Sequence, residues 1–363
     1  MERYIACMLL HALGDTIGYK NSNWEFFKGG GVDEKLYDFI YEGGINHVPK
    51  KGWLVSDDTI LHMKTAEALL EKFTNLNDLA SILVSKYLEA FDQFEQEGLE
   101  KRYPGGTTMK VLFKLKNGAK WNETPYNILS GGSGAAMKSL CIGLAYNGEE
   151  NRDKLIQIAI ECSRITHNSV VGYMGGLTSA LFTAFAIENI EIKRWPHMLM
   201  TIIGSDIIST YLRKTGRGFV EYENDISNFS RKWYRYIEEK FDDDGNVVFR
   251  RSNKNIFFRN KYYSENYAFR KEYPGGGGDD SVIIAYDSLI DAGDSWEKLV
   301  IYSMLHSGDT DTTGCIAAGW WGAAKGFLDV PEDRLAHLEY KNALKKLGEK
   351  LFKKYYNSGK LTN

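Results

Sequence analysis

The sequence has few of the residues that mark secreted, membrane-spanning or zinc-thiolate proteins. Its four cysteines, Cys7, Cys141, Cys162 and Cys315, lie far apart and form no C-x-x-C pair. We therefore expect buried, reduced thiols, as in a protein of a reducing compartment. No uninterrupted apolar run approaches the roughly 18 residues of a membrane helix, and the first residues do not resemble a signal peptide. These absences predict a cytoplasmic protein without a membrane partner.

An excess of charge of one sign is also missing. The chain has 45 Lys and Arg against 48 Asp and Glu, a net charge of -3, and its basic residues are scattered. This distribution offers no basic stripe for nucleic acid, so we expect no nucleic-acid partner. The 363 residues are enough for a large buried core. No Pro/Ser-rich linker and no repeat interrupts them, and we predict a single domain over residues 1–363.

Apolar residues recur mainly with the spacing of one helix face, and strand-like alternation is rare. Residues 246–249 are the main candidate for a short extended segment. The pattern predicts an all-α protein, a single orthogonal multi-helix globule with a central cleft for two metal ions. Long loops are expected at residues 29–51, 103–134 and 242–279.

Two acidic clusters, residues 56–59 near one end of the chain and residues 309–312 near the other, carry the first chemical signal. Each places two carboxylates and two hydroxyls in four residues before an apolar or small-residue stretch. Taken singly, such a cluster is typical of a helix start, where acids and hydroxyls cap the backbone. Two such clusters brought together would repel, unless hard cations such as Mg²⁺ bind their oxygens. Two metals could then hold a polar substrate between them. The clusters consist of Ser56, Asp57, Asp58 and Thr59, and of Asp309, Thr310, Asp311 and Thr312.

Three glycine-rich segments, at residues 103–106, 130–137 and 274–279, are the second signal. The middle one runs towards a helix expected to begin near Ala135, so its backbone N–H groups could bind a diphosphate. No Gly-Lys-Ser/Thr follows and no strand precedes it, which excludes the common nucleotide motifs. Each segment alone could be a flexible connector, whereas three in a helical protein favour a nucleotide-diphosphate pocket. The candidate ligand-binding residues are Gly105, Gly106, Ser130, Gly131, Gly132, Ser133, Gly134, Gly276 and Gly277.

Two single residues are further candidates. Glu25 lies between Trp24 and Phe26, and burial there would raise its pKa into a range useful for acid–base chemistry. An exposed glutamate in a surface loop is the simpler interpretation. His167 could end or cap a helix, or it could contact a ligand.

Taken together and in this order, these motifs resemble the ADP-ribosylglycohydrolase family. The arrangement is most similar to the arginine-directed branch of that family. The motifs that carry the resemblance are Gly14-Asp15-x-x-Gly18-Tyr19, Trp24-Glu25-Phe26, Val55-Ser56-Asp57-Asp58-Thr59, Gly131-Gly132-x-Gly134-Ala135-Ala136-Met137, Thr166-His167, Ala285-Tyr286-Asp287 with Ala292-Gly293-Asp294-Ser295-Trp296, and Gly308-Asp309-x-Asp311-x-Thr313.

The resemblance implies an all-α fold around a cleft with two Mg²⁺ ions, for which Mn²⁺ could substitute. It implies that the residues 131–134 hold a diphosphate, that His167 lies near the adenine and that Glu25 gates the metal site. Asp57 and Asp58 would transfer protons, although the sequence does not assign acid and base between them. The implied metal ligands are Ser56, Asp57, Asp58, Asp309, Asp311 and Thr312.

The activity implied is hydrolysis of the N-glycosidic bond between ADP-ribose and arginine on mono-ADP-ribosylated proteins, by a monomer that releases ADP-ribose. The alternatives are hydrolysis of serine-linked ADP-ribose or of O-acetyl-ADP-ribose, and a relative that binds ADP-ribose without turnover. A general dimetal phosphohydrolase is less consistent with the sequence, because no histidine ligand accompanies the acidic clusters.

Overall fold

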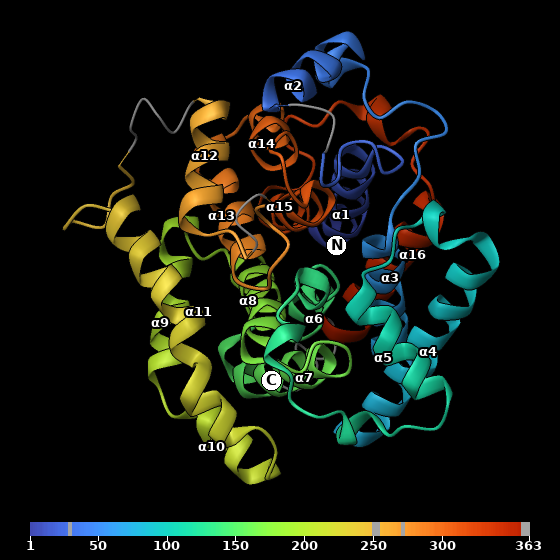
Figure 1. Cartoon of the computed structure of the whole chain (residues 1–363), viewed down its shortest axis with the longest axis vertical. Coiled ribbons are helices and arrows are strands. Elements are labelled where there is room, and N and C mark those ends of the chain that lie inside the picture. Colours follow the sequence, from blue (N-terminus) through green and yellow to red (C-terminus); the bar gives the residue numbers. More distant parts are fainter. Residues whose placement is uncertain (28–30, 249–254, 270–272, 357–363) are drawn as a thin grey trace.

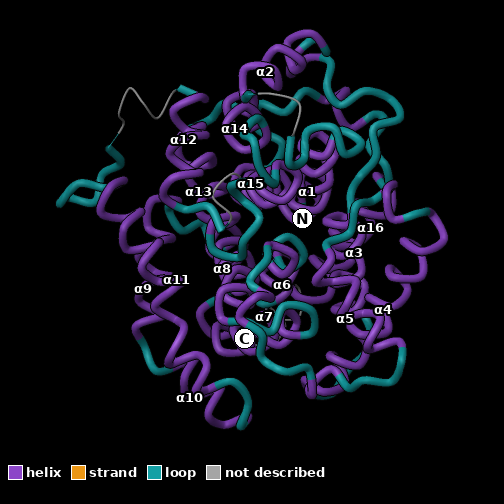
Figure 2. Tube along the Cα trace, in the orientation of Figure 1, coloured by secondary structure: helices purple, strands orange, loops and turns teal. Residues whose placement is uncertain are grey.

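The computed structural model describes residues 1–27, 31–248, 255–269 and 273–356, and these residues form helices joined by loops (Figures 1 and 2). Within these ranges there are sixteen α-helices, several short 3₁₀ turns and two isolated β-bridges, but no β-strand. The predicted all-α class is therefore confirmed.

The helix bounds show which segments surround the later site. In chain order the helices are α1 (Glu2–Tyr19), α2 (Val32–Tyr41), α3 (Asp57–Leu70), α4 (Leu76–Glu97), α5 (Gly106–Lys116), α6 (Leu140–Ala145), α7 (Arg152–Arg164), α8 (Val170–Ile187), α9 (Trp195–Gly204), α10 (Ile207–Thr215), α11 (Phe219–Lys240), α12 (Ile256–Asn266), α13 (Asp280–Ala292), α14 (Trp296–Met304), α15 (Thr310–Lys325) and α16 (Lys341–Leu351).

Three of these helices lie where long loops were predicted, so those loop predictions were wrong. Helix α2 lies within 29–51, α5 within 103–134 and α12 within 242–279. The buried face of each helix includes a polar side chain, Lys35 in α2, Thr108 in α5 and Arg259 in α12. Because these polar residues occupy positions that are normally apolar, they break the periodicity from which a helix is recognised.

The candidate extended segment at 246–249 shows only a single contact of strand type. Val247 forms an isolated antiparallel bridge with Phe241, and Phe249 lies outside the described residues. The polar turn between them is held by the Asp242 carboxylate, which accepts hydrogen bonds from the backbone N–H of Asp244 and of Asn246.

Helices α1 and α15, from opposite ends of the chain, lie side by side in the middle of the molecule (Figure 1). Their backbones approach so closely that a Cβ atom on Gly14 would lie 2.3 Å from the carbonyl oxygen of Gly314. A Cβ atom on Gly18 would lie 2.2 Å from the carbonyl oxygen of Thr310. The Thr310 hydroxyl also donates to the carbonyl of Gly18 at 2.8 Å. Glycine at positions 14 and 18 thus permits the contact that joins the two ends.

One expectation needs correction, because helix α8 is long and apolar enough to cross a membrane by length and composition. However, 94% of that stretch is buried inside the protein. It packs against α6, α7 and α15. Its Phe182 contacts the rings of Trp195, Trp233 and Trp320. Helix α8 is therefore a helix of the hydrophobic core. The four cysteines are buried and unpaired with one another, as predicted.

Candidate functional site

A cleft of about 260 Å³ collects most of the residues that the sequence singled out. Five predicted residues are buried but do not line it: Ser56, Ser130, Gly131, Gly277 and Asp311. The predicted residues that line the cleft are Glu25, Asp57, Asp58, Gly105, Gly106, Gly132, Ser133, Gly134, His167, Gly276, Asp309 and Thr312.

The first acidic cluster starts helix α3. Ser56 is its N-cap, and the Ser56 hydroxyl accepts a hydrogen bond from the backbone N–H of Asp58 at 3.1 Å. Asp57 and Asp58 occupy the first turn, and both are buried. Capping therefore does not exclude a role in chemistry, because Asp57 and Asp58 both line the cleft.

Asp15 on α1 fixes this helix start. Its carboxylate accepts hydrogen bonds from the backbone N–H of Ser56 at 3.1 and 3.0 Å, and from the N–H and hydroxyl of Thr59 at 3.1 and 2.5 Å. On the other side, the carbonyl of Arg102 accepts from the N–H of Asp57 at 3.1 Å. The Arg102 side chain is itself bound to Glu97, to Glu339 and to the carbonyl of Val55.

The second cluster starts α15 and meets the first. Asp309 is the N-cap of α15. The Thr312 hydroxyl donates to Asp58 Oδ2 at 2.9 Å, which joins clusters that are 254 positions apart in sequence. The Ser133 hydroxyl donates to Asp309 Oδ2 at 2.9 Å and so ties the glycine segment to the same cluster. The structure thus brings the two acidic segments and one glycine segment together.

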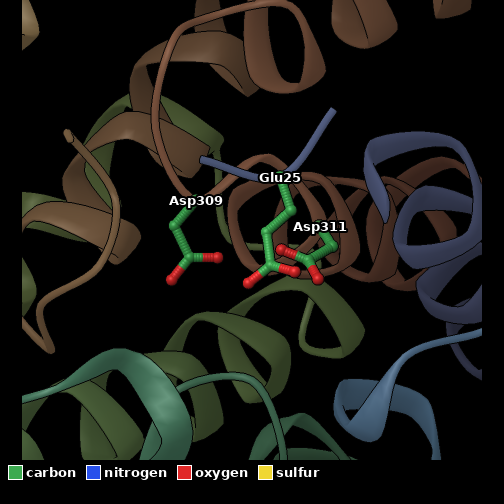
Figure 3. A group of neighbouring side chains, drawn as sticks. All are labelled: Glu25, Asp309 and Asp311. Atoms are coloured by element: carbon green, nitrogen blue, oxygen red, sulfur yellow. The ribbon is translucent and has the colours of Figure 1, made fainter. Parts of the chain in front are cut away.

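Glu25 completes a compact group of carboxylates with Asp309 and Asp311 (Figure 3). One oxygen from each of the three lies within 4.8 Å of the others. Glu25 Oε2 is buried and has no hydrogen-bond partner among the described residues. The interpretation of Glu25 as an exposed loop residue is therefore wrong, since its carboxylate points into the acidic group.

The Glu25 segment is fastened to the loop that precedes α15. The N–H of Phe26 donates to the carbonyl of Gly308 at 2.9 Å. The buried ammonium of Lys35 donates to the carbonyls of Trp24 at 2.5 Å and of His306 at 2.6 Å. These contacts direct the positive charge of Lys35 to carbonyl groups and leave the carboxylates without a direct ion pair to it.

Burial and mutual repulsion raise the pKa of the site carboxyls. Burial is the main cause for Asp57, Asp58, Asp311 and Glu25, and a neighbouring carboxylate adds to it in each case. Divalent cations would relieve this repulsion and would satisfy Glu25 Oε2. An all-oxygen donor set of this kind fits a hard cation.

The glycine segments form the part of the cleft wall that lies next to Asp309. Gly132 bridges to Gly277, Ser133 N–H donates to the carbonyl of Gly276 at 3.1 Å, and Gly278 N–H donates to the carbonyl of Gly131 at 2.9 Å. The helix expected to begin near Ala135 is instead a short 3₁₀ turn, Ser133–Ala135, and α6 begins only at Leu140. The segment therefore follows the neighbouring loop and does not lead straight into an α-helix.

His167 lines the cleft beside this wall. Its ring is buried, and burial lowers the pKa of the imidazole to about 3, so it is neutral. A Cβ atom on Gly134 would lie 2.6 Å from His167 Cε1, so glycine at 134 makes room for the ring. The alternative of a helix-end position also holds, because the His167 N–H donates to the carbonyl of Ser163 in α7 at 2.8 Å. The start of α8 is capped instead by the Ser169 hydroxyl.

Sequence reasoning assigned no role to three charged residues that organise the site: Asp15, which it named only within a motif, and Lys35 and Lys138, which it did not name. All three are buried, and their partners lie far away along the chain or on another element. The available signal was a charged residue inside an otherwise apolar helical stretch, as for Asp15 between Leu13 and Ile17.

Comparison with known proteins gives a consistent result over nearly the whole chain. The model of the ADP-ribosylglycohydrolase family matches residues 1–360. A protein of Acanthamoeba polyphaga mimivirus, named as an ADP-ribosyl glycohydrolase, is 40% identical over 350 residues, which are 93% of this chain and 67% of the viral protein. The ADP-ribosylhydrolase ARH1 of Dictyostelium discoideum is 36% identical over 377 residues, covering 96% of this chain and 93% of the relative. A solved structure described as an ADP-ribosylglycohydrolase-related protein complex has a TM-score of 0.59 at 16% identity and 97% coverage of both chains, which supports the fold.

Proposed function

Because the chain belongs to the ADP-ribosylglycohydrolase family, we propose that it is a Mg²⁺-dependent hydrolase that releases ADP-ribose from arginine residues of modified proteins. The observation that carries this proposal is a cleft lined both by a group of carboxylates, with an unpartnered Glu25 oxygen, and by glycine segments. Such a cleft offers oxygen ligands for cations and backbone N–H groups for a diphosphate.

The rim of the cleft supports arginine as the acceptor. Phe26, Tyr103 and Tyr273 line it, and the rings of Phe26 and Tyr273 lie 5.7 Å apart. Aromatic faces attract a guanidinium group, and nearby carboxylates add to that attraction. A neutral serine or acetyl leaving group would gain less from the same surroundings.

The oxygen groups of the cleft fit divalent cations, and our proposal has two. Glu25, Asp309 and Asp311, whose oxygens lie together, would hold one, and Ser56, Asp57, Asp58 and Thr312 would contribute to the other. When bound, such ions supply Lewis acidity towards sugar hydroxyls and water.

The protein's own residues would bind the diphosphate, orient the distal ribose and transfer protons. The glycine wall would hold the diphosphate, so that the distal ribose points towards Asp57 and Asp58. In the reaction, the bond from the anomeric carbon to the guanidine nitrogen breaks and a water oxygen takes its place. One water proton passes to a carboxylate, Asp57 or Asp58, and one proton is delivered to the departing guanidine. Atoms balance with water as the single co-reactant.

The test is release of ADP-ribose from a protein carrying arginine-linked ADP-ribose, with Mg²⁺, with Mn²⁺ and with EDTA. Serine-linked ADP-ribose and O-acetyl-ADP-ribose serve as comparison substrates at equal concentration. We expect metal-dependent release that is fastest from arginine. Faster release from serine or from the acetyl ester would refute the arginine assignment, and undiminished release in EDTA would refute the metal requirement.

A further inference from the structure

The cleft-facing ring of His167 ends a chain of buried polar groups that begins at Lys138. The Lys138 ammonium donates to Thr166 Oγ1, and Thr166 Oγ1 lies 2.9 Å from His167 Nδ1. Lys138 and Thr166 are both fully buried, and His167 is 3% exposed. None of these contacts involves the acidic clusters, so the chain of groups is a separate feature of the site.

The direction of the hydrogen bonds follows from proton counting. An ammonium group has three N–H donors and no acceptor, so Thr166 Oγ1 must accept from Lys138. A threonine hydroxyl has one proton to donate. Among the described residues, His167 Nδ1 is the acceptor that the structure provides for that proton. If the hydroxyl pointed elsewhere, its proton would be buried without a partner, which is unfavourable.

The same counting of donors and acceptors shows which nitrogen of the His167 ring carries the hydrogen. Burial, reinforced by the charge of Lys138, lowers the pKa of His167 to about 3, so a single ring nitrogen carries hydrogen. Since Nδ1 accepts from Thr166, the hydrogen is on Nε2. In the described part of the chain Nε2 has no protein partner, and it lies beside the glycine wall, 3.5 Å from a Cβ atom placed on Gly132 and 3.0 Å from one placed on Gly134.

We propose that Lys138 and Thr166 are positioning residues that hold His167 as the Nε2–H tautomer, so that its ring donates a hydrogen bond to a phosphate oxygen of the bound nucleotide. The ligand class rests on the proposed function, whereas the tautomer does not depend on it. Phosphate oxygens only accept hydrogen bonds, so the opposite tautomer would place a lone pair against them. The sequence contains no hint of this role for Lys138, which lies in the run Met137-Lys138-Ser139.

The first measurement is the tautomer in the ligand-free protein. Two-bond ¹H–¹⁵N correlation spectra of ¹⁵N-histidine-labelled protein separate Nε2–H from Nδ1–H imidazoles, and His167→Gln identifies the signal. We expect His167 to be Nε2–H in the unmodified protein and in Thr166→Ser. Thr166→Val, which has the same shape without the hydroxyl, should lose the single tautomer, and so should Lys138→Met. A His167 signal of the Nδ1–H type in the unmodified protein would overturn the proposal.

The second measurement is calorimetric affinity for ADP-ribose, with adenosine as a probe that lacks phosphate. Thr166→Val should weaken ADP-ribose binding roughly tenfold, the factor that corresponds to one hydrogen bond. Adenosine binding should change less, and Thr166→Ser should restore ADP-ribose binding. Equal ADP-ribose affinity in Thr166→Val and the unmodified protein would contradict the proposal. Circular dichroism spectra and thermal melts verify that each variant is folded.

These outcomes are separable from the proposed function. If the protein fails to cleave arginine-linked ADP-ribose but shows the expected tautomer and affinity changes, the hydrogen-bond chain stands and the reaction assignment falls. If it cleaves that substrate and Thr166→Val leaves the His167 spectrum unchanged, the reaction assignment stands and the hydrogen-bond chain falls.

Discussion

The backbone N–H of Ser56 donates to both carboxylate oxygens of Asp15, at 3.1 and 3.0 Å. The two residues are 41 positions apart, and the contact attaches the acidic start of α3 to α1. Thr59 adds its backbone N–H and its hydroxyl to the same carboxylate. Asp15 therefore sets where Asp57 and Asp58 lie relative to α15, because α1 also packs against α15.

We predict that Asp15→Asn lowers the affinity for Mn²⁺ by about 10- to 100-fold, the usual cost of losing a group that orients metal ligands. The amide keeps the size of the side chain but presents N–H groups to the donors of Ser56 and Thr59. Isothermal titration with Mn²⁺ measures the effect. The control is Asp92→Asn. Asp92 is an exposed residue of α4 that pairs with Lys116, and this variant should bind Mn²⁺ like the unmodified protein. Unchanged affinity in Asp15→Asn would show that the start of α3 is held without Asp15.

Asp311 lies within the group of Glu25 and Asp309 and is 3% exposed. We predict that Asp311→Asn lowers the rate of ADP-ribose release on the order of 10²- to 10³-fold, because a neutral amide removes one charge that stabilises the bound cation. Initial rates at saturating Mg²⁺ give the comparison. Asp57→Asn should show a loss of similar size, and Glu25→Gln should also slow release, because Glu25 belongs to the same group of carboxylates as Asp311. Near-normal rates in both aspartate variants would refute the metal site.

The acidic and glycine segments could be predicted because the functional groups of each segment belong to consecutive residues. Ser56-Asp57-Asp58 and the run from Gly131 to Gly134 have an unusual local composition. Their assembly depends on Gly14 and Gly18, whose role is a close backbone approach that appears only once α1 and α15 are packed. Local composition alone did not establish that the acidic clusters 56–59 and 309–312 share one site. The resemblance of the motifs to the ADP-ribosylglycohydrolase family implied it.

The residues that sequence analysis missed are buried charges with distant partners. Lys35 binds the carbonyl of His306, 271 positions away. Lys35 shares the inner face of α2 with Val32, Phe39 and the partly buried Leu36, so a charge interrupts the apolar spacing of this short helix. Burial of a lysine without partners is unfavourable, but it is tolerated here because two carbonyls accept hydrogen bonds from the Lys35 ammonium. That compensation exists only in the folded protein, and a sequence pattern does not show it.

The contact between Gly18 and Thr310 predicts a matched pair of substitutions. A Cβ atom at position 18 would lie 2.2 Å from the carbonyl oxygen of Thr310, so Gly18→Ala should lower the free energy of unfolding by about 1–3 kcal/mol. It should also lower activity, because it moves the two acidic clusters apart. Gly204→Ala is the control, since a Cβ atom at position 204 meets nothing within 4 Å. Urea unfolding of the three proteins measures the difference, and equal midpoints would mean that the α1–α15 contact adjusts freely.

The last prediction concerns how stability depends on pH through Glu97, which binds the Arg102 side chain next to Asp57. Arg102 contacts the carbonyl of Val55 at 2.8 Å, and its own carbonyl accepts from the N–H of Asp57 at 3.1 Å. Glu97 binds the Arg102 guanidinium at 2.9 Å. Burial alone would raise the pKa of Glu97, but hydrogen bonds from Gln93, Lys101 and Arg102 outweigh it and lower the pKa to about 2.

The sign of the pH dependence follows from this lowered pKa. In the unfolded chain, the pKa of a glutamate is about 4.3. The folded protein therefore gains stability from ionised Glu97 above that pH, and this gain is lost as the pH falls through about 2. We expect the difference in unfolding free energy between the unmodified protein and Glu97→Gln to be constant at neutral pH and to shrink as the solution is acidified. Glu95→Gln, on the same helix but paired with Lys116, is the control. A difference that stays constant down to about pH 3 would show that the charge of Glu97 contributes nothing to the anchoring of Arg102.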